Sequence, residues 1–322
     1  MLSIVVGHLL AFYHINTYQF GGIGVELFLL ISGFLYGEKA VSANISWFKW
    51  LKKKIQRIMI PMWLWSIIVL AGIFCVTNEF ETGIIPCFFG IQGLNFIFPF
   101  SLQVYPGLAH TWYLTVLLLF YPLVLLLNQK KVLVFLEKRY KETLACLIII
   151  QIAAAILFQT QISYFIQLFI GFLLGKKMIK LEKKSMSIIV VITFALCVIR
   201  IFARKMIDGT ALYDKVIARW TANLLMLIAF YCVQKLCNRH PKGTKRLVEG
   251  RLWSFLDGLS YEIYLTHYLF LKAVFSVSIV SDSALIQIPV FIIATLISAF
   301  FLHFVSEKII SLLQKREMRK VH

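Results

Sequence analysis

The sequence predicts an all-α membrane protein, a bundle of about ten transmembrane helices with both termini in the cytoplasm. Three observations support this fold class. Of the 322 residues, 60% are hydrophobic and only 15% are charged, which is more apolar surface than a soluble chain of this length can bury. The apolar residues form ten runs that can cross or nearly cross a bilayer. The basic residues lie between these runs, in alternate loops.

Each expected span is an apolar run with polar or basic residues at its ends. A span needs about 20 apolar residues, and a multi-spanning bundle tolerates shorter ones. No alternating strand pattern and no internal repeat is evident, which excludes a β-barrel and a solenoid. In chain order the expected spans are 1–15, 21–37, 58–77, 111–128, 143–159, 162–175, 186–203, 218–236, 257–280 and 285–306.

The positions of Lys and Arg give the orientation of these spans. With the N-terminus in the cytoplasm, the inner loops hold 26 of the 33 basic residues, the excess that short cytoplasmic loops usually carry. Basic clusters at the inner face bind anionic headgroups of membrane lipids, so the net charge of +18 does not require nucleic acid as a partner. The inner loops are 38–57, 129–141, 176–184, 238–251 and 307–322, and the outer loops are 16–20, 78–110, 160–161, 204–217 and 281–284.

The domain organisation follows from these loops. We expect one transmembrane domain, residues 1–307, and a basic cytoplasmic tail, residues 308–322. The long outer loop 78–110 contains three prolines and several aromatic residues. It is therefore expected to dip into the edge of the bilayer or to cap an outer cavity.

Two ionisable side chains lie within the first two expected spans. His8 is in the middle of the first span, and Glu26 is in the outer half of the second. A short turn joins the spans, so we expect antiparallel helices with these two groups at similar depth. The carboxylate would then accept from one imidazole nitrogen and leave the other to take a proton. A purely structural contact between the helices explains the same residues, and the sequence leaves both interpretations open.

The ninth expected span carries a row of polar side chains. Ser260, Tyr264 and His267 recur at helical spacing and share one face. We expect this face to line a cavity in the inner half of the membrane, because it would sit poorly in lipid. At the outer end of the fourth span, Trp112 fits an interfacial aromatic belt, which explains the nearby His110 less well.

Common nucleotide-binding, hydrolase and metal motifs are not found. The sequence contains no GxxxxGK[ST], no Gx[SC]xG and no HExxH, and its six cysteines have no metal-ligand spacing with histidine. We therefore expect no metal and no permanently bound cofactor.

Five short motifs occur in an order that resembles the acyltransferase-3 family of integral membrane O-acyltransferases. This family includes O-acetyltransferases of surface polysaccharides and peptidoglycan. Each motif alone is weak, and the ordered set is fairly specific. The motifs are Val6-Gly7-His8, Gly24-Val-Glu26-Leu-Phe28-x3-Ser32-Gly33-Phe34, Lys53-Lys54-x2-Arg57-x3-Pro61, His110-x-Trp112-Tyr113-Leu114 and Ser260-Tyr261-x2-Tyr264-Leu265-x-His267.

The resemblance implies transfer of an acyl group, usually acetyl, from cytoplasmic acyl-CoA as co-substrate to a hydroxyl of a cell-surface or lipid-linked glycan. It implies a location in a bacterial plasma membrane. The family's key histidine falls on His8 and its acidic position on Glu26. The residues matching those that would bind the CoA phosphates are Lys53, Lys54 and Arg57. Those implied to line the substrate site or acyl tunnel are Ser32, His110, Trp112, Tyr264 and His267.

One feature of the family has no counterpart. Family members carry an Arg or Lys further upstream than the seven residues that precede His8 here. Either the natural chain begins upstream, or this chain is a degenerate and inactive member. The short first span favours the first interpretation. We therefore expect a truncated N-terminus.

A proton-coupled secondary transporter or glycan flippase is the alternative function. It would use His8 and Glu26 as a proton relay. Such proteins commonly show internally repeated halves, which this sequence lacks. The sequence does not indicate the acceptor sugar or the oligomeric state.

Overall fold

The computed structural model covers the whole chain and describes residues 2–15, 20–39, 46–99, 101–241 and 249–319. Within these ranges every regular element is helical. Six helices are long and apolar enough to cross a membrane. The described residues therefore support a multi-pass helical protein with six clear spans, fewer than the ten expected. Four basic residues of the expected inner loops, Lys242, Lys245, Arg246 and Lys320, lie outside the described residues.

Nine of the ten expected spans fold as one helix each in the described part of the chain. Two of these helices are short, because 11 and 13 residues extend only about 16 and 20 Å in a hydrocarbon core of roughly 30 Å. The last helix continues well past its expected end and includes most of the expected tail. The helices are α1 (Leu2–Phe12), α2 (Phe20–Glu38), α3 (Trp47–Thr77), α6 (Trp112–Leu127), α7 (Lys130–Phe158), α8 (Ser163–Gly175), α9 (Lys183–Ile207), α10 (Ala218–Arg239) and α14 (Ala284–Arg319).

The expected ninth span, 257–280, is not a single helix. Gly258 ends the first piece, and glycine favours such an end because it loses the most backbone freedom in a helix. After Thr266 the α-helix gives way to short 3-10 segments, which rarely continue for long. The pieces are α12 (Arg251–Gly258), α13 (Ser260–Thr266), η4 (His267–Leu271), η5 (Ala273–Phe275) and η6 (Val277–Ile279).

The long loop 78–110 is ordered and packs into the core. Its Ile84, Leu108 and Cys87 side chains are fully buried. The backbone of Gly93 lies so close to α6 that an added Cβ would be 2.1 Å from the carbonyl oxygen of Trp112. The loop therefore packs against the middle of α3 and the first half of α6. Its segments are η1 (Thr82–Ile84), α4 (Ile85–Phe89), α5 (Leu94–Ile97) and η2 (Pro106–Thr111).

Helices α2 and α8 pack through glycines at matching positions. A Cβ at Gly33 would lie 2.0 Å from the Leu168 carbonyl oxygen, and one at Gly171 would lie 2.2 Å from that of Leu30. Gly37 and Gly175 repeat the contact one turn later. Small residues at such spacing let helix backbones approach closely in a membrane. Because later residues of α2 contact later residues of α8, the two helices are parallel.

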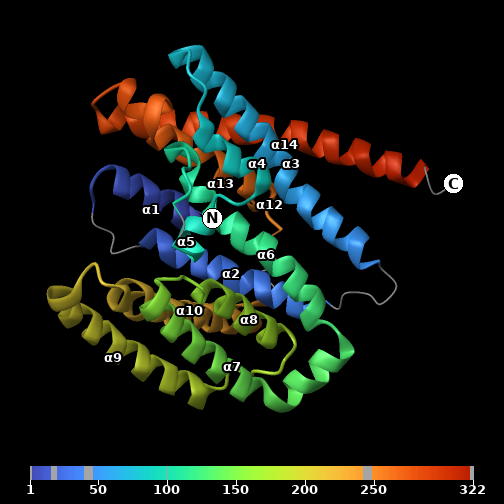
Figure 1. Ribbon diagram of the computed structural model, residues 1–322, viewed down its shortest axis with the longest axis vertical. Helices are drawn as coiled ribbons and strands as arrows, with labels where there is room; N and C mark the ends of the chain where they lie inside the picture. The colour runs from blue at the N-terminus through green and yellow to red at the C-terminus, as the bar shows by residue number, and fades with distance from the viewer. Residues whose placement is uncertain (1, 16–19, 40–45, 100, 242–248, 320–322) are drawn as a thin grey trace.

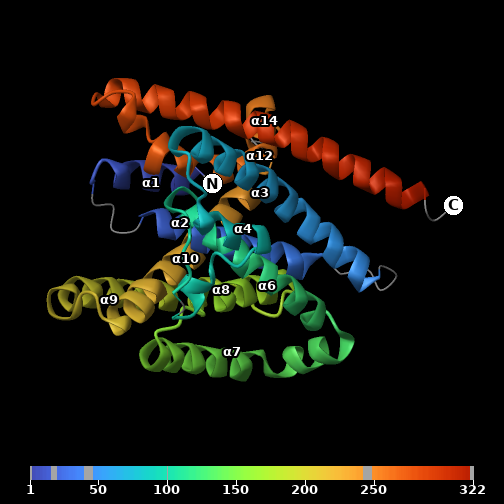
Figure 2. The ribbon, with the colours of Figure 1, turned by 45° about the horizontal axis from the view of Figure 1, so that its top comes forward.

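Helix α10 runs in the same direction as α2. Arg219 faces Glu26 at one end, and the Phe230 ring packs against the Phe34 ring, with 5.3 Å between ring centroids, further along both helices. Helices α2, α8 and α10 correspond to the second, sixth and eighth expected spans. In the expected orientation these three spans are parallel. Figure 1 shows α2 between the group α7–α10 and the group α3, α13 and α14, and Figure 2 shows the same order after rotation.

Candidate functional site

Three histidines from distant parts of the sequence meet on α1, η2 and η4. The Nδ1 atom of His8 lies 2.9 Å from Nε2 of His267. Their ring centroids are 5.2 Å apart and their planes are 8° from parallel, as an in-plane hydrogen bond between ring nitrogens requires. The His110 ring meets His267 edge to face at a centroid distance of 4.9 Å. We call His8, His110 and His267 the histidine cluster.

The partners of His267 fix the proton positions in this cluster. Its Nδ1 lies 2.8 Å from the Tyr264 carbonyl oxygen and 3.1 Å from that of Ile263. Carbonyl oxygens only accept hydrogen bonds, so Nδ1 of His267 carries the proton and Nε2 of the neutral ring is bare. The Nδ1–H of His8 must then donate to His267. The remaining nitrogen of His8, Nε2, keeps a lone pair that can accept a proton.

His110 and Tyr264 hold η2 against α13. The Nε2–H of His110 donates to the Tyr264 carbonyl oxygen at 2.7 Å, and the Tyr264 hydroxyl donates to the His110 carbonyl oxygen. Nδ1 of His110 is buried without a partner among the described residues. The sequence placed His110 at the outer interface and both Tyr264 and His267 in the inner half of the membrane. That separation is wrong, because the structure brings all three together.

Only one member of the histidine cluster is accessible. His110 and His267 are buried, with 5% and 0% of their surface exposed, whereas His8 is half-buried. The Tyr268 ring lies 4.6 Å from the His8 ring and covers part of it. The positive charge of Lys272, which is exposed, acts on His8 electrostatically. A ligand would therefore reach this cluster through His8.

The expected hydrogen bond between Glu26 and His8 is absent from the described residues. Both carboxylate oxygens of Glu26 are buried without a hydrogen-bond partner, and its charged neighbour is Arg219, with Nη1 3.6 Å from Oε1. The reason is the register of α1 and α2. Gly24 packs on Ser3, where an added Cβ would be 2.3 Å from Oγ.

The same contact separates the two groups along the helix axes. Figure 1 shows α1 and α2 running in opposite directions. His8 and Glu26 therefore lie on opposite sides of the Ser3–Gly24 contact, roughly 10 Å apart along the axes at about 1.5 Å per residue. His267, which two backbone carbonyls of α13 hold in place, takes the orienting position on His8 that was expected for the carboxylate.

Sequence reasoning missed Arg219. Its guanidinium lies 5.3 Å from the centroid of the Tyr164 ring, beside Glu26. The sequence does contain a signal for it, because Arg219 is one of the few basic residues outside the expected loops. An ionisable residue within a span usually faces the protein interior and has a partner.

Trp112 and Ser32 lie away from the histidine cluster. The Trp112 ring contacts the Tyr164 ring at a centroid distance of 4.5 Å, which places it near Glu26. Ser32 is half-buried beside Gly33. It follows Glu26 on α2 and is therefore further from the histidines along that helix.

The basic residues of α3 lie at the other end of α13. Lys54 Nζ is 5.2 Å from the Tyr36 ring centroid and 5.7 Å from that of Trp50, while Lys53 and Arg57 are exposed. The Tyr261 hydroxyl donates to the Ile58 carbonyl oxygen at 2.7 Å, which ties α13 to the turn after Arg57. From Tyr261 to His267 the chain advances about 9 Å. A single short segment thus links the basic residues to the histidine cluster.

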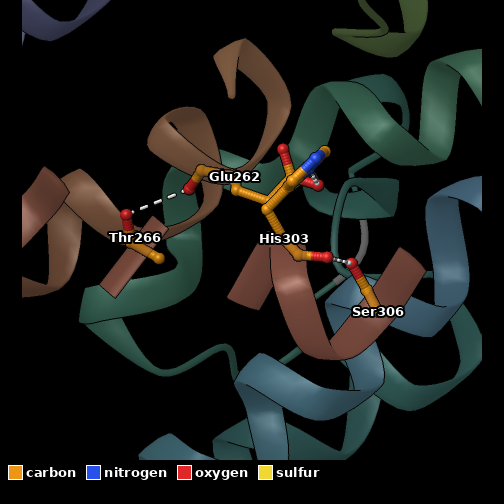
Figure 3. Close-up of polar contacts among 4 residues, drawn as sticks. All are labelled: Glu262, Thr266, His303 and Ser306. Carbon is orange, nitrogen blue, oxygen red and sulfur yellow. Dashed lines mark hydrogen bonds and ion pairs between the residues drawn. The ribbon is translucent and has the colours of Figure 1, made fainter. Parts of the chain in front are cut away.

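A carboxylate–imidazole hydrogen bond does occur elsewhere, between α13 and α14. Nδ1 of His303 lies 3.2 Å from Oε1 of Glu262. Figure 3 shows the two side chains directed at each other, with the hydroxyls of Thr266 and Ser306 bonded to the backbone carbonyls of Glu262 and His303. This pair was not expected from the sequence, although both groups lie within expected spans.

Comparison with known protein families gives a match to this chain. A family model described as an acyltransferase domain, acyltransferase-3, matches residues 1–304 and so includes every residue of the site. Neither the curated proteins nor the solved structures gave a match.

Proposed function

Because this chain belongs to the acyltransferase-3 family, over residues 1–304, we propose that it is a membrane O-acyltransferase that moves an acetyl group from cytoplasmic acetyl-CoA to a hydroxyl of a cell-surface or lipid-linked glycan. The observation that carries the proposal is the lone pair on Nε2 of His8, fixed by the hydrogen bond from His8 to His267. Ester formation from an alcohol needs such a base.

His8 acts as the general base. Its Nε2 takes the proton of the acceptor hydroxyl as the oxygen attacks the thioester carbonyl carbon. The new C–O bond forms, the C–S bond breaks, and the proton passes from His8 to the thiolate of CoA. Atoms and charge balance without a further reactant. The Lys272 charge, which acts on His8, would also stabilise the negative charge that develops on the carbonyl oxygen.

His267 is a positioning residue in this mechanism. It holds the tautomer and the ring plane of His8, the role that an aspartate has in a catalytic triad. The carbonyls of Ile263 and Tyr264 fix His267 in turn. No carboxylate in contact with His8 is needed for this orientation.

Lys53, Lys54 and Arg57 would bind the phosphates of CoA. Arg and Lys are the side chains that pair with phosphate oxygens most strongly. The aromatic rings of Tyr36 and Trp50 lie beside the ammonium group of Lys54 and help to hold this side chain extended. Tyr261 ties α13 to α3, and His267 directly follows α13. This connection supports a bound acetyl-CoA whose phosphates contact these three residues and whose thioester reaches His8.

Acetyl-CoA turnover in membranes tests this proposal. The unmodified protein should release CoA and label glycan from radiolabelled acetyl-CoA, and His8→Ala should lose both. The matched control is His14→Gln, because His14 is an exposed histidine at the end of the same segment. A protein that moves a solute without any CoA release would instead be the transporter or flippase, an alternative that the broken helix of residues 257–280 keeps open.

A further inference from the structure

The buried Glu26 and the half-buried Arg219 form a charge pair in which the carboxylate is not satisfied by its surroundings. The closest approach of 3.6 Å is too long for a good hydrogen bond. Glu26 is 0% exposed, and both its oxygens lack hydrogen-bond partners among the described residues. A buried carboxylate in this state is costly. The mechanism above gives it no task.

Two buried amides lie one helical turn further along the same helices. Asn223 follows Arg219 by four residues on α10, and Gln167 follows Tyr164 by three on α8, so each shares a face with its predecessor. They are 2% and 1% exposed. Both polar atoms of the Asn223 amide and the Nε2 of Gln167 have no partner in the described part of the chain.

The three helices bring the faces that carry these groups into one region. Helices α2, α8 and α10 are parallel and in contact (Figure 1), and Glu26, Tyr164 and Arg219 lie at one level of them. Asn223 and Gln167 lie about one helical turn further along the direction of α2. We call Glu26, Gln167, Arg219 and Asn223 the polar cluster. Its five unpartnered atoms include donors and acceptors, and an aromatic ring, that of Tyr164, stands beside it.

We propose that the polar cluster binds the sugar hydroxyls of the acceptor glycan. A hydroxyl both donates and accepts, so it can satisfy a carboxylate, an amide oxygen and an amide N–H at once. The Glu26 carboxylate would repel a phosphate, and an acyl chain would leave every polar atom unpaired. This inference rests on the proposed acyltransferase function and adds the residues that recognise the acceptor.

The position of the polar cluster fits this role. It is roughly 10 Å from His8 along α1 and α2, so a glycan of more than one ring can occupy both. One ring would present its hydroxyl to Nε2 of His8 while the next ring fills the polar cluster. Trp112, which contacts Tyr164, supplies a second aromatic face for such a ring.

Acceptor kinetics test the inference. The probe is the neutral polysaccharide of the expressing organism's envelope, freed of O-acetyl groups by mild base, titrated against labelled acetyl-CoA. Asn223→Ala and Gln167→Ala should each raise the polysaccharide concentration needed for half-maximal transfer by about tenfold, the usual effect of losing a hydrogen bond to bound substrate. The KM for acetyl-CoA should not change.

The matched control is Gln151→Leu. Gln151 is a buried amide whose oxygen accepts from Trp220 at 2.7 Å, so it is already satisfied and lies outside the polar cluster. Its replacement should alter stability without altering the acceptor requirement. Folded yield is measured for each variant by gel filtration in detergent.

Two results would overturn the proposed role of the polar cluster, and a third would overturn the acyltransferase function on which it rests. Normal acceptor kinetics in folded Asn223→Ala and Gln167→Ala protein would mean that water alone fills the polar cluster, and would overturn the inference. A change in the KM for acetyl-CoA instead would also overturn it. If the unmodified protein itself shows no His8-dependent CoA release, the proposed function fails first.

Discussion

At the scale of single residues, His267 should matter through His8 rather than through substrate. His267→Ala removes the acceptor that fixes the His8 tautomer. We expect the kcat of acyl transfer to fall by about 100-fold, the lower end of the factor that positioned general-base catalysis contributes. The KM for acetyl-CoA should stay the same because His267 is remote from Lys53, Lys54 and Arg57 along α13.

Rescue distinguishes positioning from simple structural damage. His267→Gln retains an amide oxygen near the position of Nε2 that can accept from His8, so it should keep more activity than His267→Ala at equal folded yield. Equal loss in both variants would show that His267 only supports the fold.

At the scale of elements, close approach of α2 and α8 fixes the level of Glu26. Gly33→Leu would place side-chain atoms where the Leu168 carbonyl lies, 2.0 Å from the added Cβ. The backbones cannot move apart without opening the core, so we expect a destabilisation of about 3 kcal/mol or more and little folded protein. The measurement is thermal unfolding in detergent.

Gly258→Ala is the control for this prediction. An added Cβ at Gly258 meets nothing within 4 Å, so this variant should unfold at the temperature of the unmodified protein or above it. A stable Gly33→Leu protein would contradict the tight packing of α2 and α8.

The Glu262–His303 pair joins α13 to α14 and should act on stability. Glu262→Gln retains the shape of the side chain but weakens the hydrogen bond to His303. We expect a loss of about 1–3 kcal/mol in the free energy of unfolding and unchanged acyl transfer per folded molecule. Lost transfer at normal stability would instead place this pair in the reaction.

At the scale of the whole molecule, the orientation in the membrane is the main prediction from the charge pattern. In a protein whose six cysteines are replaced, single cysteines at Lys138 and Met206 sample an expected inner loop and an expected outer loop. Both side chains are exposed. An impermeant maleimide added to intact cells should label Met206→Cys and not Lys138→Cys. The reverse pattern would invert the orientation.

The sequence predicted local features better than contacts. Apolar runs and charged ends determine where helices form, so nine expected spans appear as helices in the described residues. The break in residues 257–280 was missed, because the apolar run continues across Gly258 and Thr266, where the helical pieces end.

The sequence predicted which residues belong to the candidate site better than it predicted which of them contact each other. The sequence singled out His8, His110 and His267, which do meet. It paired His8 with Glu26 because a short turn made them neighbours in depth. The actual register depends on Gly24 packing against Ser3, a contact that the length of an apolar run does not specify.

The central claim is that His8 presents a bare Nε2, and nitrogen-15 NMR of histidine-labelled protein in membranes at neutral pH tests it most directly. The His8 signals are identified by their loss in His8→Gln. We predict a protonated Nδ1 and an unprotonated Nε2. A proton on Nε2 of His8 would contradict the account, because that atom could then not take the proton of the acceptor hydroxyl.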